Sequence, residues 1–177
     1  MQDFSNVNEL IQRADKKTEL PGNFFDLLSK DDDWSIVIKC HALLETVIRI
    51  WVNDRFHELS GVGFEDYLLN LSLNSRAGIL VLAKKLSIVC DFDVEFIKLL
   101  SSVRNRYAHK IGNIGIGLDK MLNDNEKRDL ALFHKQCYVT ASETGISEQV
   151  IHVTQNIYIR VALSAWINYK PASEDVK

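Results

Sequence analysis

Proline is almost absent from this chain of 177 residues, which has only Pro21 and Pro171. Proline removes a backbone donor and clashes with the preceding helical turn, so it ends or kinks most helices. The long stretch between these two residues can therefore form helices without such interruption. The proportion of hydrophobic residues, 46%, is that of a globular protein with a packed core.

Apolar residues recur along the chain with the spacing of amphipathic helices. The alternation expected of strands is confined to short runs such as "YIRVAL". We therefore expect an all-α helical bundle. The expected helices cover about residues 5–17, 24–28, 34–57, 64–71, 75–88, 93–109, 118–122, 124–139 and 147–169.

Two of these helices, 34–57 and 147–169, are apolar around most of their circumference, so we expect them to pack side by side at the centre of the bundle. The three aspartates at 31–33 can cap the first of them and complement its dipole. The tryptophans Trp34, Trp51 and Trp166 belong to these two helices and are expected in the core.

The length is typical of one domain, which we expect at residues 1–170, followed by a flexible tail at 171–177. The amino terminus lacks the basic start and apolar run of a secretory signal. No apolar stretch approaches the roughly 18 residues that span a bilayer. We therefore expect a cytoplasmic protein with no membrane partner.

The net charge of −3 argues against a protein that coats nucleic acid through bulk electrostatics. The segment from Lys84 to Lys110 differs from the rest, because it holds six basic and three acidic residues. A local basic patch can bind phosphate even when the whole molecule is acidic. This segment is therefore the candidate surface for a phosphate-bearing ligand.

The segment ends in "SSVRNRYAHK", residues 101–110, which is polar on one side of its expected helix. At about 100° per residue, the apolar stripe of that helix consists of Phe96, Leu100, Val103 and Tyr107. The opposite, polar sector consists of Lys98, Ser101, Ser102, Asn105 and His109, with Arg104 and Arg106 at its edges. This pattern predicts that the histidine faces away from the core of its own helix.

Arg104, Asn105 and His109 can perform phosphate chemistry without a metal or cofactor. A histidine can remove a proton from a ribose 2′-hydroxyl or protonate a leaving 5′-oxygen. Arginine can donate two hydrogen bonds to the non-bridging oxygens. Asn105, one turn before His109, can orient the imidazole or share a ligand with it. One histidine cannot easily serve as both acid and base, so we expect a homodimer that brings two together.

The stretch "RNRYAH" resembles the signature of HEPN-domain proteins, an arginine followed after four to six residues by a histidine, often with asparagine directly after the arginine. The preceding text, from "LAKKLSIVCDFDVEF" onward, is similar to branches that include proteins related to the mannitol operon repressor. The resemblance covers about residues 33–168. The chain has Ile111 where many toxin members of the family have a tyrosine.

This resemblance implies a HEPN-like bundle, a homodimer and a metal-independent endoribonuclease of a toxin–antitoxin, defence or stress system. It implies catalytic roles for Arg104 and His109 and a supporting role for Asn105. RNA and a protein antitoxin or regulator are the implied partners. We expect the substrate to be bound by Lys98, Ser101, Ser102, Arg106 and Lys110.

Two alternatives stand beside this interpretation. Arg104 and His109 lie near a helix carboxyl end, where basic residues are favoured by the dipole and form surface pairs. The second alternative is a non-catalytic regulatory or interaction module of the same fold, as in some members of the family.

His41, Glu45 and Arg49 recur every four residues along the 34–57 helix. Related domains often place a polar residue of this helix near the motif, so the resemblance implies that Glu45 contacts Arg104 or His109, with His41 in support. The alternative is a local network along the exposed edge of the helix.

The remaining polar signals do not indicate a metal or cofactor site. Cys40, Cys90 and Cys137 have no paired spacing, so we expect reduced, partly buried thiols. The remaining histidines, which are expected singly at surface or edge positions, are His57, His134 and His152. The run "GNIGIG" follows a helix instead of a strand, so we expect a turn rather than a nucleotide-binding loop.

Overall fold

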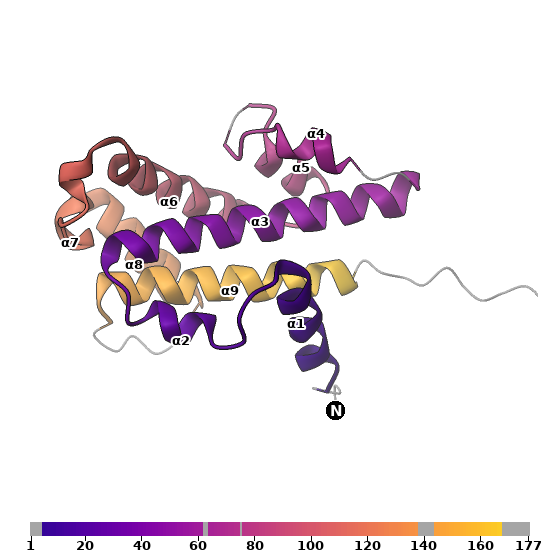
Figure 1. Cartoon of the computed structure of the whole chain (residues 1–177), viewed down its shortest axis with the longest axis horizontal. Helices are drawn as coiled ribbons and strands as arrows, with labels where there is room; N and C mark the ends of the chain where they lie inside the picture. The colour runs from indigo at the N-terminus through magenta and orange to yellow at the C-terminus, as the bar shows by residue number, and fades with distance from the viewer. Residues whose placement is uncertain (1–4, 62–63, 75, 138–143, 168–177) are drawn as a thin grey trace, which may run out of the picture.

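A computed structural model describes residues 5–61, 64–74, 76–137 and 144–167, and these residues form helices and connections without a strand (Figure 1). The predicted all-α class is therefore confirmed. The elements are α1 (Ser5–Thr18), α2 (Phe24–Leu28), α3 (Asp33–Ser60), α4 (Glu65–Leu69), α5 (Ile79–Lys85), α6 (Asp91–His109), the 3-10 helix η1 (Ile111–Asn113), α7 (Leu118–Met121), α8 (Asp124–Cys137) and α9 (Ile146–Ile167).

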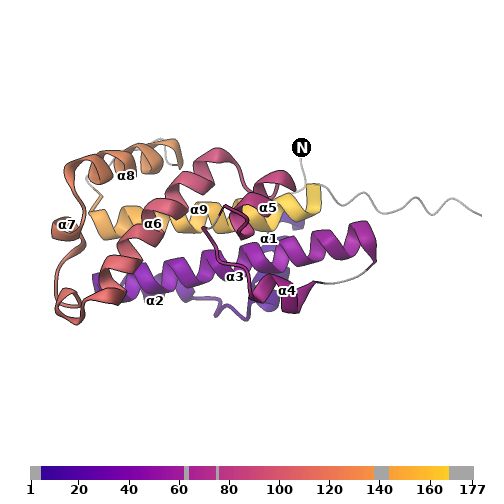
Figure 2. The same cartoon turned by 90° about the horizontal axis from the view of Figure 1, so that it is seen from above.

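The two longest helices, α3 and α9, lie side by side and run in the same direction (Figures 1 and 2). Asp33 at the start of α3 accepts a hydrogen bond from Ser147 at the start of α9. Further along, Trp51 and Ser164 line the same small cavity. The prediction that these helices pack together is confirmed, and many of the fully buried side chains lie on them.

The other helices cover this central pair. In Figure 1, α1 and α2 lie below α3 and α9, and α4, α5 and α6 lie above α3. Figure 2 shows α6 crossing the pair obliquely, and α8 packs against both α6 and α9. The rings of Phe92 on α6 and Phe133 on α8 meet edge to face, with centroids 5.2 Å apart. Helix α6 is therefore covered on one side and open on the other.

The ends of α3 follow from local chemistry. Asp32 is the N-cap, and its carboxylate accepts a hydrogen bond from the Ser35 amide at 2.8 Å. The helix continues to Ser60, three residues beyond the predicted end. It stops at Gly61, which adopts a left-handed φ of 70° that glycine tolerates. The Gly61 amide donates a hydrogen bond to the His57 carbonyl.

Helix α5 is shorter than predicted, because the sequence pattern placed a helix at 75–88 and the structure has one at Ile79–Lys85. Gly78, directly before it, is extended. Ser87, two residues after it, has a left-handed φ of 57°, which breaks the helical backbone. Helix α4 is also shorter than its predicted range 64–71, whereas the predicted ends at 139 and 169 lie outside the described residues.

The tryptophans are less central than predicted. Trp34 and Trp51 are half-buried and pack against the core, while the side chain of Trp166 lies outside the described part of the chain. Lys17 of α1 lies 5.0 Å above the centre of the Trp51 ring. Within the described ranges, no helix combines the length and the hydrophobicity that crossing a membrane would require.

Candidate active site on helix α6

Helix α6 positions the predicted motif near its carboxyl end. Its apolar stripe is buried as predicted, with Phe96, Leu100, Val103 and Tyr107 each at most 3% exposed. On other sides of the helix, Asn105 and His109 are exposed and Arg104 is half-buried. The outward orientation predicted for the histidine is therefore confirmed.

The glycine-rich connection after α6 holds this end of the helix. The Asn113 side chain donates a hydrogen bond of 2.7 Å to the Arg106 carbonyl, which the end of the helix leaves unpaired. The buried Tyr107 hydroxyl donates to the Ile116 carbonyl at 2.8 Å. The connection forms η1 and a turn, as predicted, and it fixes the backbone from which His109 projects.

Arg104 and Asn105 form a pair at the surface. The Arg104 guanidinium donates a hydrogen bond of 3.0 Å to the Asn105 amide oxygen. The amide oxygen of Asn105 is used by its neighbour, and no hydrogen bond joins Asn105 to His109 among the described residues, so a role of Asn105 toward His109 stays a prediction. Among the described residues, Arg104 has no ion pair and His109 has neither a hydrogen bond nor an ion pair. Both groups are therefore available to a ligand.

Ser101 is the clearest correction to the predicted site. The helical wheel placed it in the outward polar sector, but it is only 4% exposed. Its hydroxyl donates to the Ile97 carbonyl at 2.7 Å and lies 3.0 Å from Nε2 of His41 on α3. The packing of α3 against this part of α6 buries Ser101, so it cannot contact a substrate directly.

Three other residues predicted to bind the substrate are exposed, as expected: Lys98, Ser102 and Lys110. Lys98 is paired with Glu95 one turn earlier, at 2.8 Å, on a well-exposed surface. Such a pair is weak, so a bound phosphate could displace the carboxylate. Lys110 directly follows His109 and has no ion pair with another described residue.

Arg106 is bound to the protein itself. Its guanidinium contacts both carboxylate oxygens of Glu126 on α8, at 2.8 and 3.1 Å, and the Met121 carbonyl at 2.8 Å. Glu126 also accepts from the Asn123 amide, while the Asn123 side chain accepts from the Glu126 amide. This capping-box spacing at the start of α8 is the sequence signal that could have identified Glu126.

We therefore expect a structural role for Arg106 in place of the predicted substrate-binding role. Arg106→Ala should lower the free energy of unfolding by about 1–2 kcal/mol, because a partly buried charged pair loses one member. It should change phosphodiester affinity by less than about twofold, within the spread of surface substitutions. Urea unfolding and oligonucleotide binding measure the two effects, with Lys110→Ala as the exposed control. Lost affinity at unchanged stability would restore the original assignment.

The predicted set on α3 forms a network. The Arg49 guanidinium donates to Glu45 at 2.7 Å, and Glu45 lies 3.7 Å from Nδ1 of His41. In the part of the chain that the structure describes, the polar contacts of the Glu45 side chain are with these two residues, so the predicted contact with Arg104 or His109 is not seen. The alternative of a local network along α3 is therefore what the structure shows, although His41, at 7% exposed, does not lie on an exposed edge.

Two further histidines are paired, although the sequence pattern indicated that they stand alone. His134 on α8 and His152 on α9 lie 3.1 Å apart, Nε2 to Nδ1, with stacked rings whose centroids are 5.3 Å apart. His134 is buried, whereas the third of these histidines, His57, is exposed as predicted. Burial lowers the pKa of His134, the charge of His152 lowers it further, and Glu148 opposes the shift.

This arrangement predicts that stability falls in mild acid. Unfolded histidine titrates near pH 6.5, so below that pH the unfolded chain binds protons that buried His134 and His41 resist. The free energy of unfolding should be greatest above about pH 7 and decrease toward pH 5. His134→Gln should flatten this decrease by up to about 1.4 kcal/mol per pH unit, whereas His57→Gln should not. Urea unfolding at pH 5 to 8 checks this, and equal slopes for wild type and His134→Gln would contradict it.

The three cysteines are free thiols, with Cys40 buried, Cys137 half-buried and Cys90 exposed. The expectation that all three are partly buried is therefore wrong for Cys90, which is the N-cap of α6. Burial raises the pKa of Cys40 to about 12, which keeps this thiol protonated at neutral pH. No group of three or more His, Cys, Asp or Glu side chains among the described residues could hold a metal ion.

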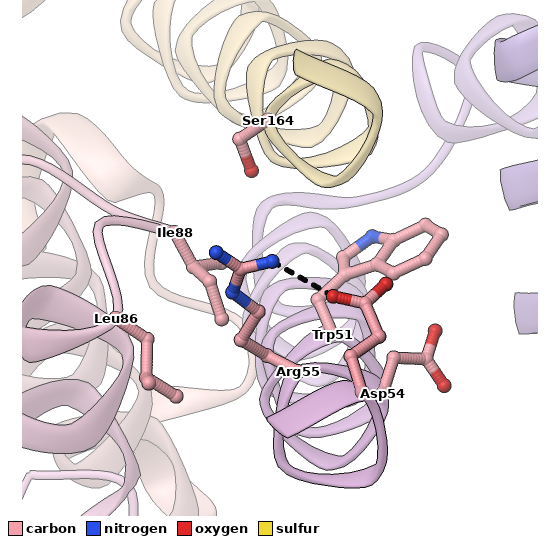
Figure 3. A pocket seen from close by; sticks show the side chains of 7 residues that line it. Trp51, Asp54, Arg55, Leu86, Ile88 and Ser164 are labelled. Carbon is pink, nitrogen blue, oxygen red and sulfur yellow. Dashed lines mark hydrogen bonds and ion pairs between the residues drawn. The ribbon is translucent and has the colours of Figure 1, made fainter. Parts of the chain in front are cut away.

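Three cavities or grooves among the described residues lie away from the motif. A cavity of about 20 Å³ lies between α3, the α5–α6 connection and α9, with Trp51 and Ile88 among its lining (Figure 3), and has room for about one water. Open grooves of about 340 Å³ and 350 Å³ lie beside α4 and at the end of α8. Arg104, Asn105 and His109 line none of these spaces, so the candidate site is an open face.

Comparisons with known proteins add no relative. No model of a known protein family matches the chain, and no curated protein or solved structure matches it either. Function is therefore inferred from the residues of the chain and from their geometry.

Proposed function

We propose that this protein is a metal-independent endoribonuclease with a HEPN-like bundle, acting in a toxin–antitoxin, defence or stress system. In this proposal Arg104 binds the phosphodiester, His109 transfers protons and Asn105 supports Arg104. The observation that carries it is the open end of α6, where Arg104 has no acidic partner among the described residues and exposed His109 follows within two turns. Arg49 and Arg106, by contrast, are neutralised by carboxylates.

The chemistry requires little beyond these side chains. Arg104 can donate to the non-bridging oxygens and stabilise the charge that develops during attack by the 2′-hydroxyl. His109 can accept the hydroxyl proton, or donate one to the leaving 5′-oxygen. Such a reaction leaves a 2′,3′-cyclic phosphate on one product and a 5′-hydroxyl on the other.

A second copy of the chain is part of the proposal. The motif lies on an open face of one chain, and a single His109 cannot readily be both acid and base in the same turnover. A two-fold axis beside the end of α6 would place two copies of Arg104 and His109 around one phosphodiester. An enclosed cleft around the motif, which the described residues of one chain do not form, would then lie between two chains.

Incubation of the purified protein with a mixed RNA pool in EDTA tests this proposal, with the oligomeric state measured in parallel. We expect a dimer that produces cyclic-phosphate ends, and no cleavage of a pool in which every ribose is 2′-deoxy. The absence of cleavage by a stable dimer, across a pool of diverse sequence, would contradict the ribonuclease proposal.

A non-catalytic regulatory or interaction module is the second candidate. The observation in its favour is a group of exposed apolar side chains at the end of α3 and on α4: Leu59, Phe64, Tyr67 and Leu69. One of them, Leu69, lines the groove of about 340 Å³ together with Ile50 and Leu68. Exposed apolar groups beside a groove are typical of binding surfaces. In this case His109→Ala would have no effect on function, whereas Leu69→Ser would weaken the protein's association with its partner.

A further inference from the structure

A buried histidine lies beside Arg104, and its protonation state can be read from its contacts. The Ser101 hydroxyl donates its hydrogen to the Ile97 carbonyl at 2.7 Å. Its oxygen must therefore accept the hydrogen bond that joins it to His41 Nε2 at 3.0 Å. Neutral His41 thus carries its proton on Nε2, and its Nδ1 presents a lone pair.

That Nδ1 faces a carboxylate that is held in place. Glu45 Oε2 lies 3.7 Å from it, while Oε1 accepts from Arg49 at 2.7 Å. Arg49 in turn donates to the carbonyls of Leu68 and Leu71, so its guanidinium is held by the end of α4 and by the turn that follows it. The Glu45 carboxylate is therefore already in position to pair with a proton added to Nδ1, the imidazole nitrogen that has no hydrogen bond in neutral His41.

The positive charge of Arg104 disfavours protonation of His41. It follows Ser101 by three residues on α6, so the two side chains are neighbours on the helix surface, next to His41. The charged groups that act on His41 are Glu45 from its own helix and Arg104 from α6. Burial lowers the pKa of His41 most, Glu45 raises it, and the Arg104 charge lowers it again.

We propose that a phosphodiester bound at Arg104 favours protonation of His41, so that this face binds anions more tightly as the pH falls. The bound anion neutralises the guanidinium and removes its repulsion of a protonated imidazole. The proton comes from solvent, adds to Nδ1 and completes an ion pair with Glu45, while the bond from Nε2 to Ser101 stays in place. Because coupling between two sites is reciprocal, protonation of His41 strengthens anion binding to the same degree.

This inference rests on the proposed function only in choosing Arg104 as the phosphodiester site, and it needs no cleavage. The probe is therefore a fluorescent oligonucleotide with 2′-deoxyribose throughout, which lacks the attacking hydroxyl. The parent variant is His109→Ala, so that no second histidine on this face can contribute. Affinity is measured from pH 5.5 to 8 at constant ionic strength, and proton uptake by calorimetry in two buffers of different ionisation enthalpy.

In the His109→Ala parent we expect at least about fivefold tighter binding at pH 5.5 than at pH 7.5, the lower end of typical coupling between sites. We also expect uptake of up to one proton per bound oligonucleotide. The double variant His41→Gln, His109→Ala keeps an amide donor for Ser101 but cannot titrate, so its affinity should vary far less with pH. Glu45→Gln in the same parent should reduce proton uptake while retaining an acceptor for Arg49, and it serves if the His41 variant does not fold.

Affinity that is equally pH-dependent with and without His41, or proton uptake of zero in the parent, overturns the inference. Absence of oligonucleotide binding overturns it as well, because Arg104 is then not an anion site. RNA cleavage by the wild-type protein is scored separately. Cleavage with pH-independent binding would leave the ribonuclease proposal standing without this coupling, and proton-linked binding without cleavage would do the reverse.

Discussion

Replacement of His109 by alanine should reduce RNA cleavage by about 100-fold to 10,000-fold, the range associated with loss of a general acid or base. The imidazole is exposed at the last position of α6, and it has no hydrogen bond to another described residue. The substitution should therefore change the free energy of unfolding by less than about 0.5 kcal/mol. Loss of activity would then reflect lost chemistry instead of lost structure.

The measurement is the initial rate of cleavage of the RNA pool in EDTA, at protein concentrations where the dimer is confirmed. His57→Ala is the matched control, because His57 is also exposed and lies near the end of a long helix. It should leave the rate unchanged. Full activity in a dimeric His109→Ala protein would exclude His109 from catalysis and favour the interaction-module candidate.

Replacement of Asp93 should cause a large loss in the free energy of unfolding. This carboxylate is 3% exposed, and its Oδ2 accepts a hydrogen bond of 2.8 Å from the Cys90 amide at the start of α6. Its Oδ1 is paired with Arg160 of α9. One buried carboxylate thus caps the helix that carries the motif and joins it to the central pair.

Asp93→Ala should lower the free energy of unfolding by about 3 kcal/mol, because it removes a cap and leaves the guanidinium without its partner. The side chain of Arg160 is 40% exposed, so water can compensate part of its lost ion pair. Asp93→Asn should cost less, since its amide oxygen can still accept from the Cys90 backbone. Urea unfolding at pH 7.5 measures both values.

Glu95→Ala supplies the control for Asp93. Glu95 belongs to the same first turns of α6, but its pair with Lys98 is well exposed. Its removal should cost less than about 0.5 kcal/mol. Equal losses for Asp93→Ala and Glu95→Ala would show that burial of the Asp93 contacts contributes nothing measurable.

Fewer basic side chains of the segment Lys84–Lys110 are unpaired in the structure than its composition indicates. Lys84 is paired with Asp91 and Lys98 with Glu95, and Arg106 is bound by Glu126 from outside the segment. Lys85, Arg104 and Lys110 remain without an acidic partner among the described residues. Two of these three unpaired charges, Arg104 and Lys110, lie at the carboxyl end of α6, around the motif.

Local sequence determined the helices and the face that α6 presents. Apolar spacing placed both ends of α3 and of α6, and the start of α9, within three residues of their observed positions, because burial of an apolar stripe requires a fixed period. A cap among the aspartates at 31–33 follows from the chemistry of a helix start, and the structure assigns it to Asp32. The exposure of Asn105 and His109 followed from the same period, since they lie opposite the buried stripe.

Only the tertiary structure decided which polar groups of α6 remain open. A helical wheel shows which side faces away from the apolar stripe of one helix, but it contains no information about what a neighbouring helix covers. Ser101 is buried because α3 brings His41 to it, from 60 residues earlier. Arg106 is occupied because the turn through α7 places Glu126 beside it. Such contacts depend on the angles at which helices cross and on the connections between them. They form only when the helices pack, so no periodic pattern in the sequence predicts them.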